Sequence, residues 1–477
     1  MPRALGQWLR LASLLLCLVC LSACLDSSGI RPQTQAPLAI EPGNVAITWP
    51  SAQWWQAYGD PQLNAWMTQA LAASPSLQMA AARVRQARAM AGLAEAEEAA
   101  QVDYSAQLQR KRWPGDDFYG PGSLGRTTSW NNTQGLSLSY NLDLWGRERS
   151  NRLRALSLAQ VAASSERAAA LELQGNLLRA YVGLALRFAE RDIAAAAVAQ
   201  QQQLLSVAQR RLQAGLGTQL ELSQAQAPLP QAQRQLDVAD EAIALSRHQL
   251  AALAGQPPSA GEQLQRPQLQ LSEVPTLPPN LPLALLGRRP DIVARRWQVE
   301  AQGRGVEVAK AEFYPDINLL GSLGSAAVQG GALDVLRYSK LTYGLGPALT
   351  LPIFDGGRLR AQLAERSAAY DLAVEHYNQT LINALREVAD VLVRLHSLDE
   401  QRHYVAHSLA LAQTHWRLAA VAQQRGLSDS RAVLQAQTEV FEQQRLQQQV
   451  LAAQLSRQAE LWVALGGGVL NENGATP

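Results

Sequence analysis

The most informative feature of the sequence is a pattern of hydrophobic and polar positions that occurs twice. Leu136–Gly215 matches Pro347–Gly426 at an offset of 211 residues, and beyond the glycines Leu216 meets Leu427. Each copy begins with apolar and polar residues in alternation, which predicts a strand with one apolar face. The apolar positions are Leu136, Leu138, Tyr140, Leu142 and Leu144 in the first copy and Tyr343, Leu345, Leu349, Leu351 and Ile353 in the second.

In both copies the strand leads through a glycine corner into a very long helix. About 65 residues follow Gly146, and a similar number follow Gly357, without a proline. The average helix of a globular protein has about 11–12 residues, whereas one of this length would reach on the order of 100 Å. Gly215 and Gly426 lie where these helices should end, because a helix C-terminus favours a residue with left-handed backbone angles.

Each half adds one more strand and a helix that returns from the turn. Alternation predicts strands near 102–108 and 317–323. The first return helix is expected over 218–253, kinked or broken at Pro228 and Pro230 because proline removes a backbone hydrogen bond and clashes one turn back. Its counterpart, which reaches Leu465, contains no proline. Apolar spacings of four and three predict a coiled-coil seam on the second long helix, at Val374, Tyr377, Leu381, Leu385, Val388, Leu392 and Leu395.

The N-terminus has the pattern of an export signal. A basic start precedes an apolar run over 11–21, which is shorter than the about 20 residues that a membrane-spanning helix needs. The run ends in Leu21-Ser22-Ala23-Cys24, which resembles a bacterial lipobox, and this resemblance makes Cys24 the lipidated first residue of the mature chain. The alternative is an ordinary signal-peptide cysteine. The next residue is Leu25 and not aspartate, which resembles the pattern of lipoproteins that are sent to the outer membrane.

These features divide the chain into six expected segments. A proline-rich linker separates the two copies. The segments are a signal peptide at 1–23, a lipid-anchored tether at 24–53, the first repeat at 54–255, the linker at 256–287, the second repeat at 288–467 and a tail at 468–477.

The four expected strands are long enough to cross a bilayer, but four strands cannot close a barrel. Open strand edges do not occur in hydrocarbon, because unpaired backbone groups cost too much free energy there. The chain should therefore form an oligomer: two copies would supply eight strands with a filled interior, and three would supply twelve with room for a passage. A soluble lipoprotein with coiled-coil hairpins is the alternative, but it leaves the shared length and alternation of the strands unexplained.

Composition and charge exclude several classes of function. A net charge of +2 over 477 residues gives no indication of a nucleic-acid partner. Phosphate-binding loops, nucleophile elbows and zinc-protease motifs are missing from the sequence, so no enzyme is expected. Five histidines cluster on the second long helix, where we expect a polar stripe and no metal site: His376, His396, His403, His407 and His415.

Taken in order along the chain, several short motifs resemble the TolC-like outer membrane factors, in the lipoprotein branch that serves tripartite efflux pumps. The matching segments are 54–63, 75–77, 142–147, 288–292, 354–358 and the two glycine turns. The resemblance implies a mainly α fold with a membrane β-barrel: a homotrimer with a 12-stranded barrel, four strands per chain, and a long coiled-coil α-barrel across the periplasm. It also implies a belt of small elements around the tunnel, formed by the terminal stretches. The Pro228 and Pro230 break is a departure from a straight return helix.

The same resemblance suggests a passive export duct for small molecules or drugs, in the outer membrane, that works with a periplasmic adaptor and an inner-membrane pump. A duct for secreted polypeptides and a structural lipoprotein that tethers envelope layers are the alternatives. No cofactor is expected apart from the lipid on Cys24. The adaptor should dock on the turns at Gly215, Leu216, Gly217, Gly426, Leu427, Ser428 and Asp429.

Some relatives narrow the tunnel at this end with acidic side chains. Here 416–425 contains no acid, and Arg417 and Arg425 are the charged residues at the expected constriction. On the strands we expect the lumen to be lined by Ser137, Ser139, Asn141 and Thr350, and the lipid-facing residues to be Leu136, Leu138, Leu142, Leu345, Leu349 and Ile353.

Overall fold

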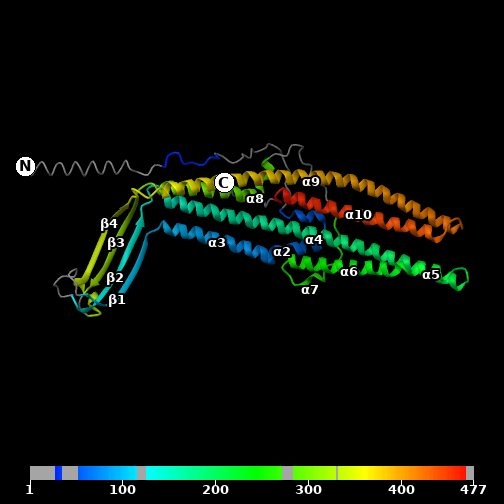
Figure 1. Cartoon of the computed structure of the whole chain (residues 1–477), viewed down its shortest axis with the longest axis horizontal. Helices are drawn as coiled ribbons and strands as arrows, with labels where there is room; N and C mark the ends of the chain where they lie inside the picture. Colours follow the sequence, from blue (N-terminus) through cyan, green and yellow to red (C-terminus); the bar gives the residue numbers. More distant parts are fainter. Residues whose placement is uncertain (1–26, 35–51, 115–124, 271–282, 329–330, 469–477) are drawn as a thin grey trace, which may run out of the picture. The chain divides into compact units, whose positions relative to one another are not determined.

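The computed structural model describes residues 27–34, 52–114, 125–270, 283–328 and 331–468, which form two compact units (Figure 1). The first unit contains residues 1–38, 83–162 and 294–378, and the second contains 39–82, 163–293 and 379–477. Each unit therefore draws on both sequence repeats. The elements are η1 (Trp54–Tyr58), α2 (Pro61–Ala73), α3 (Pro75–Glu97), β1 (Gln101–Arg112), β2 (Thr128–Asn141), α4 (Arg147–Gln213), α5 (Gln219–Gln226), α6 (Pro228–Leu253), α7 (Pro258–Gly261), η3 (Leu283–Arg288), α8 (Pro290–Ala311), β3 (Asp316–Ala327), η4 (Asp334–Leu336), η5 (Tyr338–Lys340), β4 (Leu341–Thr350), α9 (Arg358–Gln424) and α10 (Ser430–Ala464).

The first unit contains one antiparallel sheet in the order β1-β2-β3-β4, which leaves β1 and β4 as its edges (Figure 1). Paired residues of an antiparallel sheet point to the same face, and Leu136 pairs with Tyr104 on one side and Leu323 on the other. The register thus gives the sheet one mostly apolar and one mostly polar face, although Leu320 lies on the polar face and Asn132, Gln134 and Ser325 lie on the apolar one. The apolar face carries Val102, Tyr104, Leu108, Leu136, Leu138, Leu319, Leu323, Tyr343, Leu345 and Leu349, and the polar face carries Asp103, Ser105, Gln107, Ser137, Ser139, Ser322, Thr342 and Thr350.

An aspartate turns the chain from strand to helix in each repeat. The carboxylate of Asp143 accepts hydrogen bonds from the backbone N–H groups of Glu148 (3.2 Å) and Arg149 (2.9 Å) at the start of α4. Asp355 accepts from Gly357 (3.0 Å) and Leu359 (2.8 Å) at the start of α9. The hydrogen bond from Leu359 is the main cause that lowers the pKa of Asp355. These contacts satisfy N–H groups that a helix N-terminus leaves without a partner.

Part of the expected N-terminal tether packs against the helices of the first unit. Ile30 contacts a buried cluster from α8 and α9 that includes Phe313 and Leu363. The backbone N–H groups of Gln33 and Thr34 donate to the carboxylate of Asp371, at 3.0 and 2.9 Å. Within the expected lipid-anchored tether of 24–53, these residues are therefore held by one apolar side chain and two amide donors.

The second unit is built around a buried cluster on the middle of α4. The cluster collects segments from the start, the middle and the end of the chain, which agrees with the belt of small elements implied by the family resemblance. Its members include Trp54, Tyr58, Leu63, Met67, Leu177, Leu178, Tyr181, Leu184, Leu250, Leu264 and Leu455. Burying a side chain of this kind stabilises a fold by about 1.5–3 kcal/mol.

The helices confirm most of the expected pattern. α4 and α9 each have 67 residues, and the first return helix divides into α5 and α6 at Ala227. Its counterpart α10 is unbroken over 35 residues. On α9 the predicted seam is partly wrong: Ala384 and Val391 are buried, whereas Leu385, Leu392 and Leu395 are only half-buried. Within the described residues, no helix is long and apolar enough to cross a membrane.

Candidate functional site

The two turns between the long helices and their return helices share one backbone geometry. Gly215 and Gly426 have positive φ angles of 72° and 74°, which glycine adopts without a steric penalty. The N–H of Gly215 bonds to the carbonyl of Leu212 (3.0 Å) and that of Leu216 bonds to Arg211 (2.8 Å). The second turn repeats these bonds: Gly426 donates to Gln423 and Leu427 to Ala422, both at 2.9 Å. Both turns are therefore Schellman motifs.

The side chain of the leucine after each turn glycine is mostly exposed. In a Schellman motif this position usually packs on an apolar residue one turn earlier, on the same helix. Here those earlier residues are Arg211 and Ala422, and Leu216 and Leu427 remain 72% and 78% exposed. Two large apolar side chains at the same position of two repeated turns thus face solvent in the single chain.

The return helices start with well-formed caps. The hydroxyl of Thr218 accepts from the N–H of Glu221 (3.2 Å), and the Glu221 carboxylate accepts from the N–H of Thr218 (3.3 Å). The carboxylate of Asp429 accepts from the N–H of Ala432 at 3.1 Å. Asp429 was placed in the docking set from sequence, and the structure gives it this capping contact. Sequence reasoning overlooked Arg211, whose guanidinium donates to the carbonyl of Leu216 at 3.2 Å and braces the first turn.

The two helical hairpins are joined by hydrogen bonds near their turns. The Gln200 amide on α4 donates to the carbonyl of Leu434 on α10, and the Arg431 guanidinium on α10 donates to the Gln224 side chain on α5, both at 3.2 Å. Within the second hairpin, the His415 Nδ1 lies 3.2 Å from the Glu439 carboxylate. These bonds place Gly215, Leu216 and Gly217 in the same unit and at the same end as Gly426, Leu427 and Ser428.

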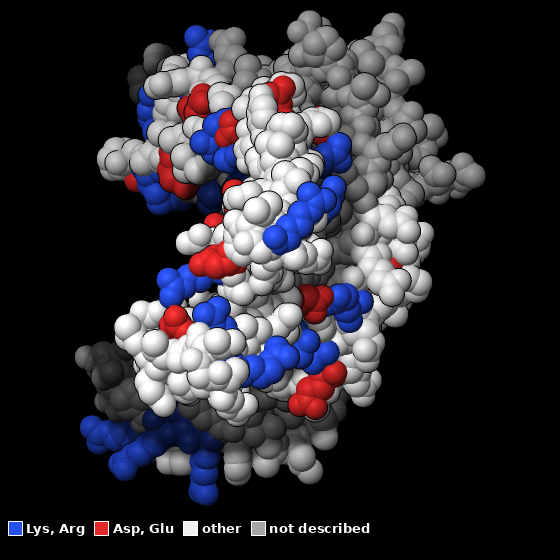
Figure 2. All heavy atoms as spheres, turned by 90° about the vertical axis from the view of Figure 1, so that its right-hand side faces the viewer, with Lys and Arg blue, Asp and Glu red and all other residues white. Residues whose placement is uncertain are grey.

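The surface at this end carries little organised charge. Figure 2 views it directly and shows basic and acidic side chains scattered over a mostly uncharged surface. Arg417 and Arg425, the residues expected at the constriction, are both exposed; Arg417 lies on α9 and Arg425 lies in the turn that follows it. A single chain does not form the tunnel wall that would face these two residues, so their position at a constriction stays a prediction.

The strand residues expected to face lipid do not all belong to strands. Leu136, Leu138, Leu345 and Leu349 share the apolar face of the sheet. Leu142 lies one residue beyond β2, although its N–H still donates to the carbonyl of Ile317 on β3 at 2.9 Å, and Ile353 lies three residues beyond β4, so the lipid-facing position of both stays a prediction. The chain turns at the Asp143 cap in the first case. In the second, Pro352 has no N–H to continue the ladder.

A buried polar network holds the second unit together beside the apolar cluster. The Asp60 carboxylate caps α2 and accepts from the Tyr181 hydroxyl (2.9 Å) and the Gln268 N–H (2.8 Å). The Tyr58 hydroxyl donates to the carbonyl of Leu455 at 3.0 Å. Burial raises the pKa of both tyrosines. The network connects η1, α2, α4 and α10, so its role is structural and not catalytic.

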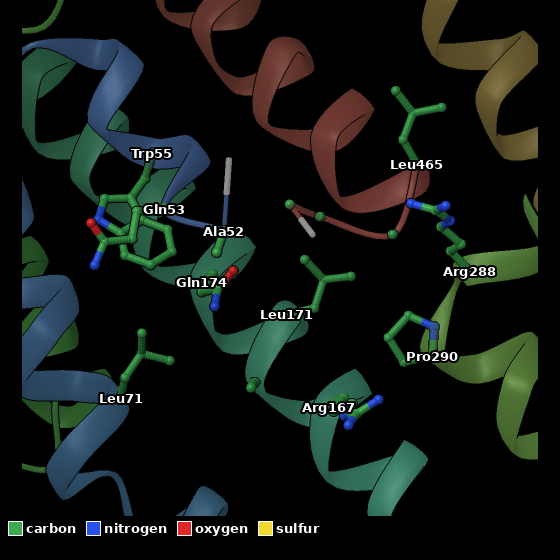
Figure 3. Close-up of a pocket in the computed structure, with 14 residues that line it drawn as sticks. Ala52, Gln53, Trp55, Leu71, Arg167, Leu171, Gln174, Arg288, Pro290 and Leu465 are labelled. Atoms are coloured by element: carbon green, nitrogen blue, oxygen red, sulfur yellow. The ribbon is translucent and has the colours of Figure 1, made fainter. Parts of the chain in front are cut away.

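The second unit also contains a cavity of about 500 Å³ (Figure 3). Leu171 and Gln174 of α4 lie on one side, and Arg288 and Pro290 lie on another. Its lining residues include no acid, histidine, serine or cysteine, so the cavity lacks a nucleophile and a general base.

Two further sequence-based predictions concern Cys24 and the clustered histidines. Cys24 lies outside the described residues. The clustered histidines all lie on α9, and within the described residues no three or more His, Cys, Asp or Glu side chains gather in a way that could hold a metal ion.

The family model for outer membrane efflux proteins matches residues 66–256 and 281–467, one match in each repeat. The chain is 47% identical over 368 residues to the fusaric acid resistance protein FusA of Burkholderia cepacia, covering 76% of this chain and 69% of that protein. It is 30% identical over 458 residues to the multidrug resistance outer membrane protein MdtQ of Escherichia coli O157:H7, covering 91% of each.

Solved structures give the same result for the fold. The outer membrane protein VceC of Vibrio cholerae is 32% identical, with a TM-score of 0.79 over 88% of this chain and 100% of that one. The CmeC outer membrane channel of Campylobacter jejuni has a TM-score of 0.84 over 93% of this chain and 96% of that one, and at 21% identity it supports the fold alone.

Proposed function

Because this chain belongs to the outer membrane efflux protein family, we propose that three copies of it form a passive export duct for small molecules or drugs. The chain is an outer membrane efflux channel with a periplasmic tunnel, and its family consists of transport ducts, not enzymes. Family members work as trimers with an adaptor and a pump.

The sheet supports the duct most strongly. Its apolar face spans all four strands, its other face is polar, and both edge strands are unpaired in the single chain. Three such sheets joined at their edges supply twelve strands, enough to enclose a passage lined by the polar face. α4 and α9, each of 67 residues, follow directly from β2 and β4.

The turn residues serve as the adaptor dock in this proposal. Leu216 and Leu427 are exposed apolar side chains at two repeated turns, and a trimer would present six of them as a rim. The exposed Arg417 lies on α9 and the exposed Arg425 lies in the second turn, where they would line a constriction of the tunnel.

Lipid on Cys24 anchors the chain to the outer membrane in this proposal. The lipobox-like sequence that ends at Cys24 supports the modification. Ile30, six residues later, is held against α8 and α9, so Cys24 can lie no more than about 20 Å from it. Mass spectrometry of the mature N-terminal peptide should find Cys24 acylated. An unmodified cysteine there contradicts the anchor but not the duct.

Dye release from sealed vesicles tests the duct itself. Vesicles that contain the purified protein should lose a small dye without any energy source and retain a large dextran. A structural tether would leave both molecules inside. That outcome would contradict the proposed function.

A further inference from the structure

The loop between β3 and β4 exposes three large apolar side chains. Leu333, Leu336 and Tyr338 are 70%, 64% and 89% exposed. Leu333 precedes the short helix η4 and Leu336 ends it. A spacing of three residues in a 3-10 turn puts both side chains on one side of that turn. Single apolar side chains are common on a protein surface, whereas three within six residues form a patch that indicates a partner.

Hydrogen bonds hold this loop on the apolar face of the sheet. The side chain of Asn132, which lies opposite Leu108 on that face, donates to the carbonyl of Ala332 at 2.7 Å. Within the loop, the carboxylate of Asp334 accepts from the N–H of Gly331 at 2.7 Å. The side chain between the two exposed leucines is buried, since Val335 is only 4% exposed. The loop therefore has a defined shape, with one apolar side chain turned inward and the others outward.

The loop meets the sheet at the upper edge of the expected apolar band. Asn132 lies nine residues from Asn141, where β2 ends beside the helices. At about 3.3 Å per residue and a tilt of about 40°, this is roughly 23 Å above that end, and the apolar band is about 25 Å tall. α4 and α9 follow from the opposite end of the sheet and form the periplasmic part of the chain. The loop therefore belongs to the outer leaflet.

Two arginines lie just above this level on the same face. Arg110 is opposite Trp130, roughly 28 Å above the lower end of β2. Arg112 is opposite Thr128, roughly 33 Å above it, and both arginines are exposed. The loop adds Arg337, whose side chain is 71% exposed. Guanidinium groups at this height reach the phosphate groups of a membrane, to which arginine binds through two parallel hydrogen bonds.

We propose that the β3–β4 loop and these arginines bind a lipid that carries several acyl chains and several phosphate groups, the phosphorylated glycolipid of the outer leaflet. Leu333, Leu336 and Tyr338 would enter the acyl region at its upper edge, while Arg110 and Arg112 bind the phosphates above it. The inference rests on the proposed duct, because the apolar face of the sheet has to face the membrane. It adds a lipid partner on the outside of the duct.

The spacing of the cations favours a ligand with more than one phosphate. Arg110 and Arg112 are about 7 Å apart along β1, and Arg337 projects from a separate loop. An ordinary phospholipid offers one phosphate, whereas a glycolipid with phosphates on separate sugars can reach several cations at once. The apolar patch beside them excludes free phosphate as the natural ligand, because an ion gains nothing from exposed leucines.

Titration of labelled lipopolysaccharide onto the full-length oligomer in a neutral detergent tests the site. Arg110→Gln with Arg112→Gln should weaken binding about 30-fold, since each basic residue near an anionic lipid surface contributes a factor of about five. The matched control is Arg295→Gln with Arg296→Gln, two exposed arginines on α8, which should bind as the wild type does. Leu333→Ser with Leu336→Ser should weaken binding at least about tenfold, because burying even one leucine contributes about that factor.

The wild-type oligomer supplies a test that does not depend on folding of the variants. Enzymatic removal of the phosphates from the lipopolysaccharide should weaken its binding to the same extent as the arginine changes, and millimolar inorganic phosphate should not compete. Equal affinity for both forms of the lipid, or equal affinity in the arginine variant and its control, would overturn the inference. Competition by inorganic phosphate with no effect of the leucine changes would leave an anion site only and would also overturn it.

Two further outcomes separate this inference from the proposed duct. Normal lipid binding but a larger conductance in the leucine variant would mean that the loop covers the mouth of the passage, which contradicts the lipid site. A wild-type oligomer that conducts ions but binds no lipopolysaccharide contradicts the lipid site alone. A wild-type oligomer that is silent in bilayers contradicts the duct, whatever it binds.

Discussion

A charge placed on the apolar face of the sheet tests its assignment to the membrane. Leu136 is the best site, because it pairs with Tyr104 and Leu323 in the interior of the sheet. It lies five residues from Asn141, the end of β2. At about 3.3 Å per residue and a tilt of about 40°, it lies roughly 13 Å above that end, near the middle of an apolar band about 25 Å tall.

Leu136→Arg should therefore cost about 2–4 kcal/mol per chain, the range for a cation on the lipid face near the midplane. Because about 1.4 kcal/mol corresponds to a factor of ten, the ratio of folded to unfolded chain should fall by at least about 30-fold. Leu138, two residues nearer the strand end, should be less sensitive. Ser137→Arg is the matched control: it has the same height but lies on the polar face, opposite Asp103 and Ser322.

The assay is the yield of heat-labile oligomer on a gel without boiling, normalised to total protein. Leu136→Arg should nearly abolish the oligomer band, and Ser137→Arg should keep it. Equal yields would refute the assignment of the sheet faces, and a loss confined to Ser137→Arg would reverse them.

Three further changes test other parts of the molecule. Leu216→Glu together with Leu427→Glu should abolish export in cells while trimer yield stays normal, because the turns carry no core contact; normal export would mean that they serve only as helix ends. Pro228→Ala with Pro230→Ala should join α5 to α6 and slow amide exchange across Ala227, since each proline in a helix costs about 3 kcal/mol. Replacing both prolines by glycine should leave the exchange fast, and identical exchange in the two double variants would refute a break caused by the prolines. The raised pKa of Tyr181 means that the folded state keeps a proton which the unfolded state loses above pH 10. Stability should therefore fall as pH rises past 10, with Tyr181 contributing at most about 1.4 kcal/mol per pH unit. Tyr181→Phe should make this slope shallower in urea titrations, while Tyr58, whose pKa is also raised, keeps its own contribution.

Much of the fold could be predicted because the pattern is long and occurs twice. The alternation in β2 and β4, the proline-free runs of α4 and α9, and the break at Pro228 are all local properties of the sequence, and the structure confirms them. Strand ends were less predictable. Leu142 and Ile353 continue the alternation, but β2 and β4 end at Asn141 and Thr350, and only Leu142 keeps a backbone hydrogen bond to the next strand.

Contacts between distant segments could not be predicted from the sequence. Nothing near Ile30 indicates that it packs on α8 and α9, or that Asp371, more than 300 residues away, holds the adjacent amides. The exposure of Leu216 was expected from its place in a turn.

Single-channel recording of the purified oligomer in planar bilayers tests the central claim most directly. A passive duct formed by three chains should give discrete conductance steps without an energy source or a partner protein, and the size of the step should change in Ser137→Arg, whose side chain would enter the passage. Bilayers that contain the inserted oligomer and remain silent would contradict the account.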